Sequence, residues 1–93
     1  MDFRRTMEMS LSREEFLRLL PAAVPVFDVD GDTVRWSEGG RPWRIRLVPL
    51  APLRVAGARL PRHRVDIVLR ECAADEGGAF MTRFHRAFLR GGG

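Results

Sequence analysis

The sequence predicts an α+β fold, a two-layer sandwich in which a mostly antiparallel β-sheet carries two helices on one face, in the order β-α-β-β-β-β-β-α. Two patterns predict it: apolar residues recur with period two in several short segments and with helical spacing in two others. The chain has 93 residues, enough for one core. We therefore expect residues 1–90 to form a single domain and residues 91–93 a flexible glycine tail.

The first strand and the first helix follow one another directly. Within residues 1–10 apolar and polar side chains alternate, with Arg5 as the exception, which is typical of a half-buried strand. Ser12 and Glu15 then have the spacing of a capping box ahead of an apolar helical face. Pro21 should end or kink that helix, because proline lacks an amide donor.

Five segments with period two follow the first helix. Residues 26–30 and 33–37 flank an Asp-Gly-Asp turn, which predicts a hairpin. After the turn at 39–40, alternation resumes over residues 43–47, from residue 53 onward, and over residues 64–70. We expect Gly57 to form a bulge in the strand that begins at Leu53, a bulge that turns Leu60 inward and Arg59 outward.

The last element predicted is a helix over residues 79–90. Its three phenylalanines, Phe80, Phe84 and Phe88, share one side with other apolar residues, as a helix packed on the sheet requires. The glycines that follow are a common helix stop signal.

Charge is distributed unevenly along the chain. Residues 1–40 hold five arginines against eight acidic residues, a net charge of −3, and residues 41–93 hold eleven against four, a net charge of +7. Asymmetry of this kind indicates an anionic partner. Between Glu38 and Asp66 there is no acidic residue and there are seven arginines: Arg41, Arg44, Arg46, Arg54, Arg59, Arg62 and Arg64. All sixteen basic residues are Arg, as in a GC-rich bacterial genome, so only their placement is informative.

The candidate binding site is the face of the sheet opposite the helices. Strand alternation predicts that six arginines project from it: Arg35, Arg44, Arg46, Arg54, Arg64 and Arg70. Such a face can follow phosphates or bind the carboxylates of a partner protein. Stacking on bases also needs exposed aromatic residues, and Phe27, Trp36 and Trp43 all take the inward positions. Alternatively, the arginines pair within the chain with the outward Asp28, Asp30 and Asp66.

No residue set in the sequence indicates a reaction, a cofactor or a metal. His63, Cys72 and His85 are the only soft metal-ligand types, and they lack the close paired spacing of a zinc site. The acidic run at 28–32 does not match the glycine and glutamate positions of a calcium loop. No phosphate-binding glycine motif is present. We therefore expect no enzymatic activity, no cofactor and no small-molecule substrate.

The last residues, 88–93, resemble the di-glycine tails of ubiquitin-like carrier proteins, whose terminal carboxylate is activated and conjugated. The resemblance covers only these residues. It departs from the family because a predicted helix runs directly into the glycines and because a third glycine is present. A carrier role is thus a minor alternative for the function.

The function that fits the sequence best is that of a small accessory protein that binds an acidic protein surface, or its own copy, through the open sheet face or its edge. A sequence-nonspecific nucleic-acid binder is the alternative. The short apolar stretches predict no membrane span. The lack of a secretory leader pattern and the single Cys72 indicate the cytoplasm.

Overall fold

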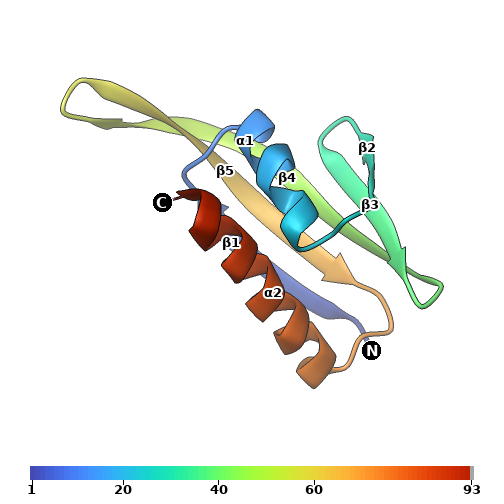
Figure 1. Cartoon of the computed structure of the whole chain (residues 1–93). Helices are drawn as coiled ribbons and strands as arrows, with labels where there is room; N and C mark the ends of the chain where they lie inside the picture. The colour runs from blue at the N-terminus through green and yellow to red at the C-terminus, as the bar shows by residue number, and fades with distance from the viewer. Residues whose placement is uncertain (93) are drawn as a thin grey trace.

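The computed structural model describes the backbone of residues 1–92 and the side chains of residues 1–89. Figure 1 shows both helices lying on one face of a five-stranded antiparallel sheet. The strands lie in the spatial order β1-β5-β4-β3-β2. In chain order the elements are β1 (Phe3–Met9), α1 (Arg13–Leu19), the 3-10 turn η1 (Leu20–Ala22), β2 (Asp28–Asp30), β3 (Thr33–Glu38), β4 (Arg41–Val55), β5 (Ala58–Leu69) and α2 (Ala74–Gly92). The predicted α+β class and antiparallel sheet are confirmed.

The middle of the chain forms fewer and longer strands than the sequence suggests. Residues 43–47 and the segment from residue 53 onward were expected to form separate strands. Both belong to β4 as far as Val55, and the rest of the second segment begins β5 at Ala58. The bulge expected at Gly57 is wrong. Ala56 and Gly57 form a two-residue hairpin turn in which both φ angles are positive, 49° and 83°. The register shift that marks a bulge lies instead between Leu50 and Leu53.

Both helix starts have a clear local cause. The Ser12 side chain accepts a hydrogen bond from the Glu15 amide at 3.1 Å, as the capping box predicts. The chain leaves α1 through η1, whose second residue is Pro21. Helix α2 begins at Ala74, five residues before the predicted start, with two acidic residues in its first turn where they favour the helix dipole. It runs through Gly92, so it overlaps the expected glycine tail, and Gly93 lies outside the described residues.

The core lies between the sheet and the two helices. Phe16 from α1 and Phe80 and Phe84 from α2 are almost completely buried, and the ring of Phe84 packs against both of the others. Trp43 is buried and Trp36 packs against the core, so both tryptophans face inward as predicted. Among the described side chains no charged or polar residue is buried, which leaves the charges to the surface.

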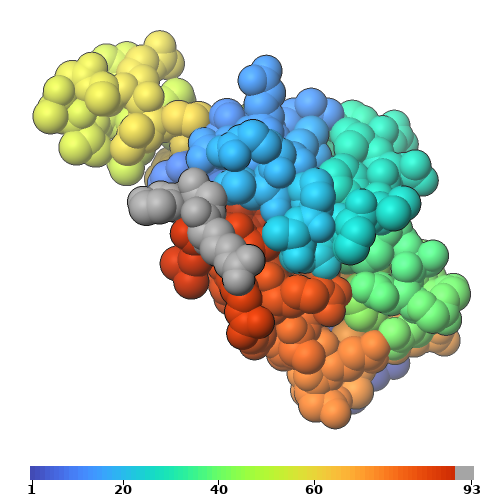
Figure 2. Space-filling model, in the orientation of Figure 1, coloured from blue at the N-terminus to red at the C-terminus, as the bar shows by residue number. Residues whose placement is uncertain are grey.

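One part of the chain leaves this body. The ends of β4 and β5 continue past the rest of the sheet as a two-stranded ribbon, and Figure 2 shows its tip projecting from the molecule in yellow and green. We call residues 50–61 the arm. The molecule is 45 Å long but only 25 Å and 22 Å across. Neither helix of the described chain combines the length and apolar character needed to cross a bilayer.

Candidate interaction site

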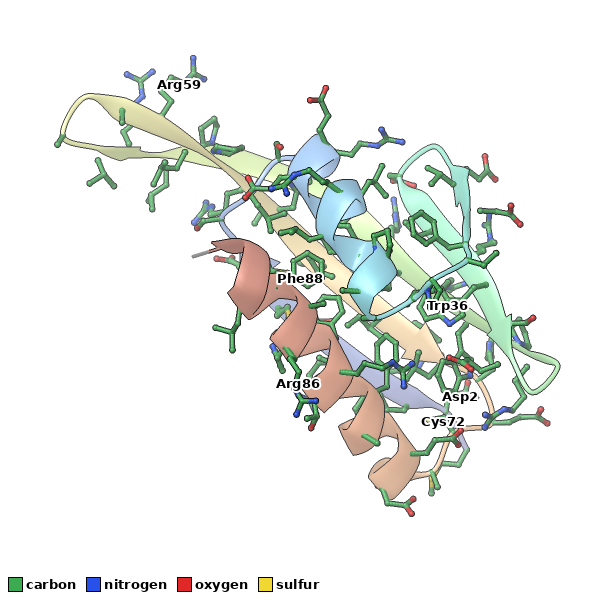
Figure 3. The ribbon with its side chains drawn as sticks, viewed as in Figure 1. Asp2, Trp36, Arg59, Cys72, Arg86 and Phe88 are labelled. Carbon is green, nitrogen blue, oxygen red and sulfur yellow. The ribbon has the colours of Figure 1, made fainter. Side chains whose placement is uncertain are left out.

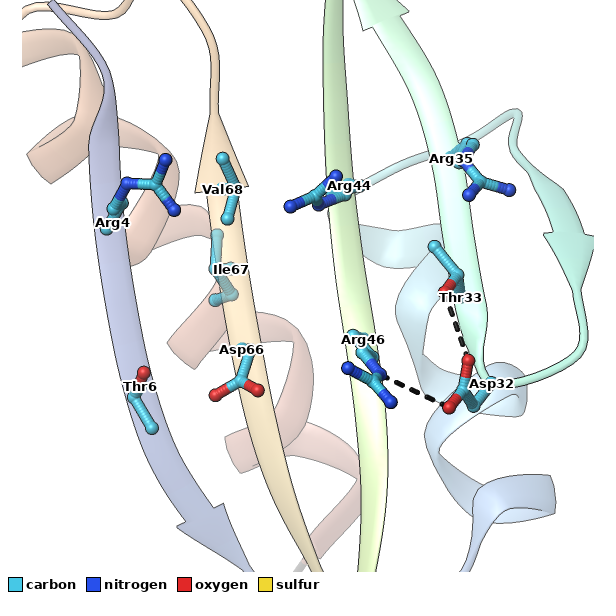
Figure 4. A pocket seen from close by; sticks show the side chains of 10 residues that line it. All are labelled: Arg4, Thr6, Asp32, Thr33, Arg35, Arg44, Arg46, Asp66, Ile67 and Val68. Atoms are coloured by element: carbon cyan, nitrogen blue, oxygen red, sulfur yellow. Dashed lines mark hydrogen bonds and ion pairs between the residues drawn. The ribbon is translucent and has the colours of Figure 1, made fainter.

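The open face of the sheet carries five of the six arginines predicted there. Arg44 and Arg46 project from β4, Arg35 from β3 and Arg64 from β5, while Arg70 follows the end of β5. Figure 4 views this face with the helices behind the sheet. Three of these arginines, Arg35, Arg44 and Arg46, line a shallow hollow of about 570 Å³. The structure thus brings together residues from β3 and β4 that the sequence assigned to one face.

Arg54, the sixth, is not part of this face. The register pairs it directly with Arg59 and pairs Leu53 with Leu60. Arg59 lies five residues before Arg64 along β5, so strand alternation places it on the opposite side. The bulge after Leu50 moves β4 by one residue, and Arg54 follows its partner. The sequence prediction failed here because a one-residue shift exchanges the two faces of a strand.

Most arginines on the open face are paired within the chain. Arg35 Nη1 lies 2.9 Å from Asp30 Oδ2, and Arg70 Nη1 lies 3.0 Å from Asp2 Oδ2. Of the acids expected as partners, Asp30 is therefore used. Both pairs lie at the surface of the protein, so each contributes about 0–1 kcal/mol. The carboxylates offset part of the positive charge of this face.

The other two pairs lie beside the hollow. Arg46 Nε donates a hydrogen bond to Asp32 at 3.2 Å, drawn in Figure 4, and Arg64 Nε lies 3.3 Å from the carboxylate of Asp66. The hydrogen bond from Arg46 lowers the pKa of Asp32, which keeps that carboxylate ionised. As an alternative to partner binding, the outward arginines were expected to pair with acids of the same chain. For Asp66 this prediction is confirmed.

Arg44 is different, because it has no carboxylate partner among the side chains described. It stands in register with Val68, and Val68 with Arg4 on β1. Val68 is only 7% exposed although it faces outward, which is consistent with the two arginine stems lying over it. Arg4 is a member of this face that the sequence did not single out, because strand order was needed to place β1 beside β5.

Arg41, the first arginine of the acid-free stretch, ties the sheet to α2. Its guanidinium donates two hydrogen bonds to the carboxylate of Glu76, at 2.7 and 2.5 Å, and one to the carbonyl of Glu71 at 2.8 Å. It also lies 5.0 Å from the ring centroid of Trp43. The hydrogen bonds from Arg41 lower the pKa of Glu76. A fourth bond runs from Nε to the carbonyl of Glu38, so most donors of this arginine are used within the fold.

The arm has two chemically different sides. Leu53 and Leu60 lie opposite each other on one side, each 41% exposed, and Arg54 and Arg59 lie opposite each other on the other. Every residue from 51 to 61 is exposed. Figure 3 shows Arg59 at the tip, away from the body of the protein. The arm contains no acidic residue, and neither of its two arginines has an ion-pair partner within the described side chains.

The residues considered for metal binding or catalysis are apart or buried. Cys72 is 1% exposed, and burial raises the pKa of its thiol, which keeps it protonated. His63 Nδ1 lies 2.9 Å from the carbonyl of Leu11, and His85 is exposed on α2. No cluster of three or more histidine, cysteine or acidic side chains suited to a metal occurs within the described part of the chain.

Comparison with known protein families, with curated proteins and with solved structures finds no match to this chain.

Proposed function

We propose that this chain is a small interaction protein that binds an acidic surface of a partner protein through the arm. The observation that carries the proposal is the arm itself: a two-stranded ribbon outside the core, apolar on one side and basic on the other, with every residue from 51 to 61 exposed. The leucine side would lie against the partner, and the arginine side would meet its carboxylates.

The energetics of the arm favour a bound state. An isolated two-stranded ribbon is marginally stable in water, because one side of each strand is unpaired. Arg54 and Arg59 stand directly opposite each other, and like charges in this arrangement destabilise a strand pair. A partner carboxylate between the two guanidinium groups would attract both of them and so offset their mutual repulsion. Complete burial of a leucine side chain contributes about 1.5–3 kcal/mol. Leu53 and Leu60 are each 41% exposed, so contact with a partner would still supply part of this energy.

A protein partner fits these features better than a nucleic acid. The arginines of the open face that could follow a phosphate backbone are largely paired with internal carboxylates. Bases have no stacking platform, because Trp36 and Trp43 pack into the core. The exposed leucines of the arm gain nothing from a phosphate backbone, whereas an apolar patch surrounded by acidic side chains on a protein would complement both sides of the arm.

The test compares two arm variants with a matched control. L53S/L60S removes the apolar side, R54E/R59E reverses the basic side, and R44E changes an unpaired arginine on the open face. Proteins from an extract of the source cells that bind immobilised wild type are quantified by mass spectrometry and then purified for titration. We expect the affinity of the purified partner to fall about tenfold or more with each arm variant and to change little with R44E.

Nucleic-acid binding is measured in parallel with a fluorescent duplex and a single-stranded oligonucleotide, at about 50 mM and about 200 mM salt. If oligonucleotide binding weakens steeply with salt and is lost in R54E/R59E, the arm binds a nucleic acid, and the proposal of a protein partner is wrong. A purified partner that binds both arm variants as tightly as wild type would refute the role of the arm.

A further inference from the structure

The two edges of the sheet differ in their capacity to pair with another strand. β2, at one edge, has three residues, two of which are the acidic Asp28 and Asp30, and short charged edge strands resist further pairing. β1, at the other edge, has seven residues and is paired on one side only, with β5. Its outer side therefore presents a row of backbone donors and acceptors to solvent.

We infer that β1 pairs antiparallel with β1 of a second copy of this chain, around a two-fold axis at Thr6. The two sheets would then join into one continuous sheet of ten strands, with the helices of both copies on the same side. This edge is separate from the arm, so the inference stands independently of the proposed partner protein.

Face matching restricts the register. In β1 the even-numbered residues Arg4, Thr6 and Glu8 face the open side, and the odd-numbered residues, which are apolar except for Arg5, lie on the helix side. Residues directly opposite each other in an antiparallel pair point to the same side, so even positions must meet even positions. A two-fold axis at Arg5 would oppose two arginines. The axis at Thr6 uses all seven residues of the strand.

The same register also matches the charges. It places Arg4 of one copy opposite Glu8 of the other, twice by symmetry, and it places the two Thr6 side chains opposite each other. Opposite charges and threonine pairs are both favourable across strands. On the helix side, Phe3 would meet Met9. The seven-residue strand is therefore complementary to itself at both of its charged outward positions.

The two charged side chains are free to make these contacts. Their side chains are 63% exposed for Arg4 and 62% for Glu8. Each now takes part in a loose ion pair on the surface: Arg4 lies 3.8 Å from Asp2, and Glu8 lies 3.6 Å from Arg62. Exposed pairs at such distances contribute little to folding, so changing either residue should leave the monomer folded.

Sedimentation velocity tests the pairing on the full chain. One seven-residue strand pair is smaller than a standard stable interface, so we expect reversible dimerisation with a dissociation constant of about 10–100 μM. The mass should rise with concentration from 10.6 kDa toward twice that value. The single variants R4E and E8R each create two like-charge pairs, and we expect each to weaken self-association about tenfold.

A mixture of the two variants provides the decisive measurement. The R4E copy carries acidic side chains at positions 4 and 8, and the E8R copy carries basic ones, so every outward charge pair across the mixed interface is again favourable. We expect the mixture, and also the double swap R4E/E8R, to recover the wild-type affinity within about threefold. The arm variant R54E/R59E serves as the control and should dimerise like wild type.

Three results would overturn the inference. A wild type that stays monomeric up to about 500 μM has no such edge pairing. Dimers that tolerate R4E and E8R form through another surface. If R4E and E8R remain folded by circular dichroism but their mixture does not recover the affinity of self-association, the register around Thr6 is wrong.

Discussion

Replacing Gly77 by alanine should destabilise the protein, although alanine is the better helix former. Gly77 is buried in the first turns of α2, where the helix lies against β1. A Cβ atom at this position would lie 2.1 Å from Cδ2 and 2.3 Å from Cγ of the Phe3 ring. Carbon atoms do not approach this closely, so the ring or the helix must move. Overpacking of this kind costs about 1–3 kcal/mol.

The adjacent Gly78 gives a matched control. It lies in the same helix but is exposed, and a Cβ atom there would meet nothing within 4 Å. Alanine at either position gains the same helix propensity, about 0.8–1 kcal/mol over glycine. G78A should therefore raise the free energy of unfolding by about that amount. The propensity gain cancels in the comparison, so G77A should be less stable than G78A by the overpacking cost alone, about 1–3 kcal/mol.

Urea denaturation and thermal unfolding measure this difference. In a domain of this size each kcal/mol corresponds to about 4–8 °C in Tm. The clash is assigned to Phe3 by repeating both substitutions in an F3A background. There the ring is absent, and G77A should become as stabilising as G78A. Equal stability of G77A and G78A in the wild-type background would show that α2 does not lie against Phe3 as described.

Three further predictions concern the charge pairs, the thiol and the arm. Because Arg41 lowers the pKa of Glu76 below its ordinary value of 4.5, the folded state binds fewer protons at this site than the unfolded state. The contribution of Glu76 to stability should therefore be lost as the pH falls from above 4.5 through the lowered pKa. Glu76→Gln should flatten the dependence of Tm on pH between about pH 6 and about pH 3. The buried Cys72, whose thiol pKa is raised, should react with iodoacetamide at least about 100-fold faster in urea than in the native protein, and equal rates would contradict its burial. L53S/L60S should change the free energy of unfolding by about 0.5 kcal/mol or less, because both leucines lie outside the core; a larger loss in urea denaturation would show that the arm supports the body.

Alternation of apolar residues was sufficient to predict the class, the inward tryptophans and the open face. It failed where β4 and β5 leave the body. The segment from residue 53 was expected to be a strand of its own, whereas β4 runs through Pro49 and Pro52, although proline cannot donate to a ladder. In the arm both strands are edges, so a proline can point its missing donor away from the partner strand. Pro52 lies within the register shift between Leu50 and Leu53, where ladder bonds are interrupted in any case.

The start of α2 and the composition of the open face were missed for different reasons. The helix was expected to begin at residue 79, but Gly77 and Gly78 lie within it, and the first of them is required by the approach of Phe3. Arg4 could not be placed beside Val68, because the pairing of β1 with β5 joins residues 54 to 66 positions apart. Such a long-range pairing leaves no local signal in the sequence.

Four arginines of the acid-free stretch show two kinds of surroundings that the fold creates. Arg46 and Arg64 reach Asp32 and Asp66, carboxylates supplied from outside the stretch by the turn before β3 and by the body of β5. Arg54 and Arg59 lie beyond the end of the sheet, where no other strand or helix runs beside them to supply an acid. A genome that favours arginine codons would account for the residue type at all four positions, but it would not account for two opposed arginines that the fold leaves uncompensated. An anion from another molecule would compensate them, which is the interaction that the proposed binding through the arm requires.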